Sequence, residues 1–77
     1  MNDMQSIADG YVSSILLNNG FVADLGYSYM NDSCVVEVGL DSYTVRHNGY
    51  EYITRDHVIY TLIGYLVYNR LVIDIVI

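Results

Sequence analysis

The spacing of apolar residues changes along this chain, and that change constrains its fold more than any other feature. In residues 3–19 apolar side chains recur every three or four positions, which predicts an amphipathic helix. In residues 21–54 they alternate with polar ones, which predicts strands. The helical spacing returns in residues 55–69, and residues 71–77 are almost entirely Leu, Val and Ile, which predicts a final buried strand.

Turn signals divide the alternating region into four strands. Asn31-Asp32 and Asp41-Ser42 separate the first three, and Asn48-Gly49 is the strongest hairpin signal in the chain. A two-residue turn at Asn48-Gly49 places Arg46 opposite Glu51, so that opposite charges pair across the hairpin. We expect one α+β domain over residues 1–77, with the order α-β-β-β-β-α-β. Two helices would cover one face of a largely antiparallel sheet of about five strands.

Size and composition favour self-association. A chain of 77 residues buries only about 60–65% of its unfolded surface, so its stability is marginal without further support. Cys34 is the single cysteine, so no disulfide within the chain is possible. Yet 53% of the residues are hydrophobic, which is more than so small an interior accommodates. We therefore expect a homodimer.

The charge balance restricts the class of partner. The chain has nine acidic residues, three arginines and no lysine, for a net charge of −6. Three scattered cations cannot neutralise a phosphate backbone, so direct nucleic-acid binding is disfavoured, as is binding to anionic membranes. A protein with a basic surface, such as a nucleic-acid enzyme, is the natural counterpart.

Location follows from weaker signals. Residues 58–77 are apolar enough to raise the question of a membrane span, but Asn69, Arg70 and Asp74 argue against insertion. The first residues lack the cationic start and apolar run of a signal peptide, and the lone thiol fits a reducing compartment. We expect a cytoplasmic protein that does not enter a membrane.

Two surfaces are candidates for partner binding. The first is the sheet face away from the helices, where alternation groups four carboxylates near Arg46: Asp24, Glu37, Glu51 and Asp74. They could imitate the spaced charges of a nucleic acid, or they could simply keep an open sheet face soluble. The second is the back of the second helix, where Tyr60, Tyr65 and Tyr68 occur without any charge. This back could pack inside one subunit or form a homodimer or partner interface.

Residues suited to catalysis are few. No metal-binding, phosphate-binding or nucleophile motif is present, and we expect no cofactor and no metal. A nucleophilic site of Cys34, His57 and Asp56 is the enzymatic alternative, and it lacks a supporting motif. We therefore assign no catalytic residue and expect a protein that is not an enzyme.

Two functional hypotheses remain. In the first, the protein is a small acidic inhibitor or modulator that occupies a basic nucleic-acid-binding site on another protein. Phage inhibitors of host defence nucleases, including many anti-CRISPR proteins, are comparable in size and charge, which is an analogy and not a family resemblance. In the second, it is a dimerising structural or regulatory subunit that acts through the tyrosine-lined helix.

Overall fold

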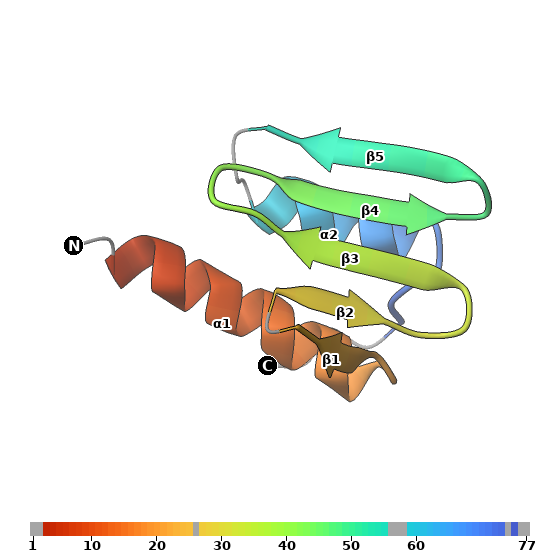
Figure 1. The fold of residues 1–77 in the computed structure, drawn as a ribbon, viewed down its shortest axis with the longest axis horizontal. Coiled ribbons are helices and arrows are strands. Elements are labelled where there is room, and N and C mark those ends of the chain that lie inside the picture. Colours follow the sequence, from red (N-terminus) through yellow and green to blue (C-terminus); the bar gives the residue numbers. More distant parts are fainter. Residues whose placement is uncertain (1–2, 26, 56–58, 74, 76–77) are drawn as a thin grey trace.

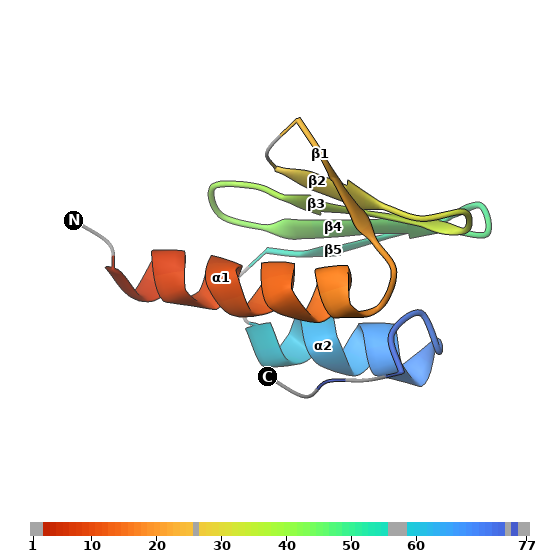
Figure 2. The same ribbon diagram turned by 90° about the horizontal axis from the view of Figure 1, so that it is seen from below.

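The protein forms a two-layer α+β domain, described here from a computed structural model over residues 3–25, 27–55, 59–73 and 75. Its elements are α1 (Asp3–Asn18), β1 (Val22–Asp24), β2 (Ser28–Met30), β3 (Cys34–Val38), β4 (Tyr43–His47), β5 (Tyr50–Thr54) and α2 (Ile59–Tyr68). The strands form one antiparallel sheet in chain order (Figure 1). Figure 2 shows both helices on the same side of that sheet. The predicted fold class is confirmed.

The order of elements differs from the predicted one in the first strand region. Residues 21–30 form two strands, β1 and β2, instead of one. Between them Leu25 adopts a left-handed backbone conformation with φ of 58°. A left-handed residue breaks the alternation of a strand, so Leu25 and Tyr27 are exposed and do not join the core. The observed order is therefore α-β-β-β-β-β-α.

The predicted final strand is the second correction, because none of the described residues after α2 belongs to a strand. Arg70 is left-handed, with φ of 58°, and Leu71 N donates a hydrogen bond of 2.8 Å to Leu66 O. This closure resembles the left-handed C-cap that ends many helices and turns the chain back on itself. Val72 is buried, whereas Ile73 is 86% exposed.

The hairpin at Asn48-Gly49 is confirmed. Both turn residues have positive φ, 50° and 81°, as a type I′ turn requires. Arg46 pairs with Glu51, and the register runs without interruption along β4 and β5. The Asn-Gly pair therefore set both the turn and the register.

The core lies between the sheet and the two helices. Its fully or nearly buried members come from both helices, from strands β3 and β4 and from the flanking segments: Val12, Ile15, Leu16, Phe21, Cys34, Val36, Tyr43, Val45, Leu62, Leu66 and Val72. Tyr29 OH donates to Ser13 Oγ at 3.0 Å, which links β2 to α1. Within the described parts of the chain, neither helix combines the length and apolarity needed to cross a membrane.

Candidate functional site

The sheet has one face that no helix covers, here called the outer sheet face (Figure 2). Side chains alternate along a strand, so the strand register assigns residues to this face. Asp24 pairs with Ser28, which pairs with Glu37, and Arg46 pairs with Glu51. Three of the predicted partner-binding carboxylates, on β1, β3 and β5, thus share one face. The fourth, Asp74, lies outside the described residues.

Arg46 stands between two of these carboxylates. Its Nη1 is 2.9 Å from Glu37 Oε1, and its Nε is 2.8 Å from Glu51 Oε2. Hydrogen bonds to Glu37 and then Glu51 raise the pKa of Arg46, so the guanidinium stays charged at any physiological pH. The three side chains form one exposed ion-paired row across β3, β4 and β5, which lowers the negative charge of the outer sheet face.

Apolar side chains share the outer sheet face with this row. Val22 pairs with Met30, Met30 pairs with Val35, and Val35 pairs in turn with Arg46. On the same face, Ile53 of β5 pairs with Thr44 of β4. Val22 is largely exposed, and Met30 and Ile53 are partly so. The face is therefore a mixture of aliphatic groups and ion pairs, and its acidity is weaker than the alternation pattern predicts.

The exposed side of α2, here defined as Tyr60, Thr61, Gly64, Val67 and Tyr68, is the second surface. Tyr60 is 80% exposed and Tyr68 is 86% exposed, and none of the five residues is charged. A solvent-facing helix of a soluble domain ordinarily carries Lys, Glu or Arg on this side. Two of the three predicted tyrosines therefore lie together on an uncharged, open surface.

Tyr65 does not lie on that surface, which corrects the sequence-based placement. Its ring stacks on Tyr52 of β5, with centroids 3.9 Å apart and planes inclined by 1°. Its hydroxyl oxygen lies 2.6 Å from His47 Nε2, at hydrogen-bonding distance. Burial, followed by the neighbouring Tyr52 and Cys34, raises the pKa of Tyr65 above its ordinary value. Tyr65 thus anchors α2 to β4 and β5.

The side-chain positions of the two helix glycines face open space. A Cβ atom built at Gly10 or at Gly64 meets no atom within 4 Å outside its own helix backbone. Gly64 therefore forms part of the open surface of α2.

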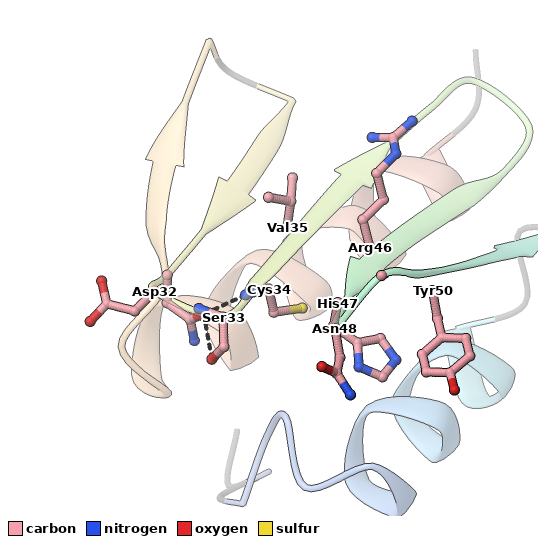
Figure 3. Close-up of a pocket in the computed structure, with 10 residues that line it drawn as sticks. Asp32, Ser33, Cys34, Val35, Arg46, His47, Asn48 and Tyr50 are labelled. Atoms are coloured by element: carbon pink, nitrogen blue, oxygen red, sulfur yellow. Dashed lines mark hydrogen bonds between the residues drawn. The ribbon is translucent and has the colours of Figure 1, made fainter.

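A depression of about 400 Å³ lies at one end of the sheet, between the β2–β3 turn and the β4–β5 hairpin (Figure 3). Asn31 Oδ1 accepts hydrogen bonds from the backbone N–H groups of Ser33 and Cys34, each at 2.9 Å. In Figure 3 the side chains of Asp32 and Arg46 point away from one another and from His47. Cys34 and His47, which are paired across β3 and β4, both line the depression.

Cys34, the candidate nucleophile, is buried on the helix side of β3. Burial raises the pKa of its thiol to about 11, so the thiolate is scarce at neutral pH. Its proposed partners Asp56 and His57 lie outside the described residues. Among the residues that the structure does describe, no three His, Cys, Asp or Glu side chains are placed to hold a metal ion.

Sequence reasoning missed the contact between His47 and Tyr65. One signal could have found it, because His47 continues the alternation of Tyr43 and Val45 and so belongs on the buried face of β4. The proximity of Tyr65 depends on where α2 packs, which the local pattern does not contain.

Comparisons with protein-family models, with curated proteins and with solved structures gave no match.

Proposed function

We propose that this protein is a dimerising structural or regulatory subunit that binds through the exposed side of α2. One observation carries the proposal: Tyr60 and Tyr68 are 80% and 86% exposed on a helix side without charge. Tyrosine is enriched among the residues that dominate interface energetics, because it provides a large rigid contact area with a polar tip. Charged residues are depleted at interface centres, as they are on this side of α2.

The remaining exposed apolar groups on and beyond α2 support the same proposal. Val67 is 42% exposed next to Tyr68, and Ile73 is 86% exposed in the segment that follows α2. Apolar area that stays in water lowers solubility, and covering it contributes about 25 cal/mol per Å². Association would give these groups the burial that the small core does not provide.

Removing the two tyrosines tests the proposal. We expect Tyr60→Ala and Tyr68→Ala each to weaken dimerisation about fivefold or more, because interface anchors contribute more than about 1 kcal/mol each. Sedimentation equilibrium over micromolar concentrations measures the dissociation constant. Tyr27→Ala is the matched control, since Tyr27 is also exposed but lies between β1 and β2. A wild-type protein that sediments as an 8.7 kDa monomer throughout would refute the proposal.

The second candidate function is the acidic inhibitor that occupies a basic nucleic-acid-binding site on another protein. The specific observation in its favour is that Asp24, Glu37 and Glu51 share the uncovered face of a chain with net charge −6. Opposite fields accelerate encounter between proteins even where individual ion pairs add little affinity. The Arg46 bridges reduce this field, which is why the candidate ranks second.

Neutralising the three carboxylates tests this second candidate. We expect the triple variant Asp24→Asn, Glu37→Gln, Glu51→Gln to associate more slowly with a basic partner recovered from the source cell, and to lose salt dependence. Charges are screened beyond about 8–10 Å at physiological ionic strength, so the change should appear in the association rate. Stopped-flow binding at several salt concentrations measures it. Asp32→Asn with Asp41→Asn changes carboxylates outside the face; equal slowing by this control would argue against a specific acidic surface.

A further inference from the structure

β5 forms an open edge of the sheet. It is the last strand in the sheet order and pairs with β4 alone among the described strands (Figure 1). In a two-residue hairpin the residues that flank the turn, His47 and Tyr50, exchange hydrogen bonds. Alternation then directs the backbone polar groups of Tyr50, Tyr52 and Thr54 toward β4. Those of Glu51 and Ile53 point outward, where a further strand can pair with them.

The usual protection of an edge strand is absent from β5. Natural edges are blocked by proline, by lysine, by bulges or by very short strands. This chain has no proline and no lysine, and β5 is five residues long, with an unbroken register against β4. Ile53 is one of the two outward-facing positions of β5 and is 37% exposed. The edge is thus suited to pairing with another strand.

We propose that β5 pairs antiparallel with β5 of a second copy, about a two-fold axis at Ile53, so that the two sheets become one. The inference rests on the proposed self-association and names the strand and register through which it occurs. Charge complementarity favours a second copy of β5 as the strand that pairs with this edge. With the axis at Ile53, Glu51 lies opposite the partner's Arg55, and Arg55 lies opposite the partner's Glu51.

Other antiparallel registers lack this complementarity. An axis at Glu51 sets two carboxylates against each other, and an axis at Tyr52 or Thr54 sets a charged residue opposite Ile53. Arg55 follows β5 directly, is exposed, and makes no ion pair with the described residues. Glu51 uses Oε2 toward Arg46, and its side chain remains half exposed. Both charged residues are therefore available to a second copy.

This pairing also accounts for part of the uncharged side of α2. A two-fold axis between antiparallel edge strands is perpendicular to the sheet, so the helices of both copies lie on the same face. Tyr65 stacks on Tyr52 of β5, which places α2 next to the edge. Thr61 and Tyr68, four residues before and three after Tyr65, lie on that side of the helix. The two α2 helices would therefore flank the axis, with Thr61 and Tyr68 of each helix on the side toward the other copy.

The first test places a charge at the axis. We expect Ile53→Lys to bring two ammonium groups together and to weaken the dimer more than about tenfold, because like charges directly opposite are destabilising. Val22→Lys is the matched control on β1, the other edge strand, and should leave dimerisation unchanged. Sedimentation equilibrium reports association, and circular dichroism confirms that both variants fold. An Ile53→Lys protein that folds and dimerises as the wild type does would overturn the inference.

The second test reverses one charge of the predicted pair. Arg55→Glu sets Glu51 against a glutamate twice per dimer, and we expect the dissociation constant to rise about tenfold or more. Arg70→Glu makes the same change at an exposed residue after α2 and should have no such effect. Equal dissociation constants for the two variants would contradict the register.

The third test detects the axis directly. Paired residues that exchange hydrogen bonds across antiparallel strands have Cα atoms about 5.5 Å apart, within the range of a disulfide. Ile53→Cys should therefore cross-link into a covalent dimer under mild oxidation, while Val22→Cys should not, and Cys34 is buried. A dimer that resists Ile53→Lys and does not cross-link at position 53, but dissociates in Tyr60→Ala, would refute this inference and keep the proposed function. A monomeric wild type would refute both.

Discussion

Replacing Leu16 by alanine is expected to lower the free energy of unfolding by about 2–5 kcal/mol, the usual cost of deleting a buried leucine. Leu16 has no exposed surface and packs at the centre of the core with Ile15 and Phe21. A domain of 77 residues is stable by about 4–12 kcal/mol, so this single change removes a large share of the total. Urea unfolding monitored by circular dichroism gives the free energy.

The neighbouring residue provides the control. Leu17 carries the same side chain on the same helix but is about half exposed. Leu17→Ala should therefore change the free energy of unfolding by less than about 1 kcal/mol. Equal losses for the two variants would mean that α1 does not pack as the structure shows.

Replacing Val72 by aspartate is expected to have a still larger effect. Val72 is 1% exposed and belongs to the core, although it lies in the irregular segment after α2. An unpaired carboxylate there would lose its hydration without a compensating partner, which costs several kcal/mol or forces the segment out of the core. We expect a partly or fully unfolded protein at 37 °C, measured by thermal denaturation.

Ile73→Asp is the control. It shows whether any aspartate in this segment destabilises the protein, or only an aspartate at a buried position. Ile73 is 86% exposed, and its backbone N–H, which donates to Asn19 Oδ1 at 3.0 Å, is retained by aspartate. We expect a melting temperature close to that of the wild type. If residues 71–77 formed a strand buried on both faces, as the sequence predicts, both substitutions would instead strongly lower the melting temperature.

The hairpin and the two helices could be predicted because their determinants are local. Asn48-Gly49 accepts positive φ at both turn positions, and that turn forces Arg46 opposite Glu51 whatever the rest of the chain does. The same alternation correctly placed Asp24 and Glu37 with Glu51 on one face. It could not show that Arg46 bridges Glu37 as well, because that contact also requires β3 to lie beside β4.

The site on α2 was only partly predictable. Tyr60 and Tyr68 are exposed as the helical spacing indicates, but Tyr65 turns toward the sheet to meet Tyr52 and His47. Tyr65 lies at the boundary of the helix's buried stripe, where a side chain's direction depends on the neighbouring layer. Spacing along one helix does not specify that layer.

The sequence by itself determined the α+β class, the helix positions and the β4–β5 register, since hydrophobic period and turn chemistry act over a few residues. Only the tertiary structure decided the path of residues 70–73. The β-branched residues after α2 favour a strand, but strand propensity is realised only where a sheet edge is in reach. The left-handed turn at Arg70 and the burial of Val72 beside Leu66 direct this segment back to the helices instead. Packing outweighed propensity there, because burying Val72 releases more free energy than the backbone preference costs.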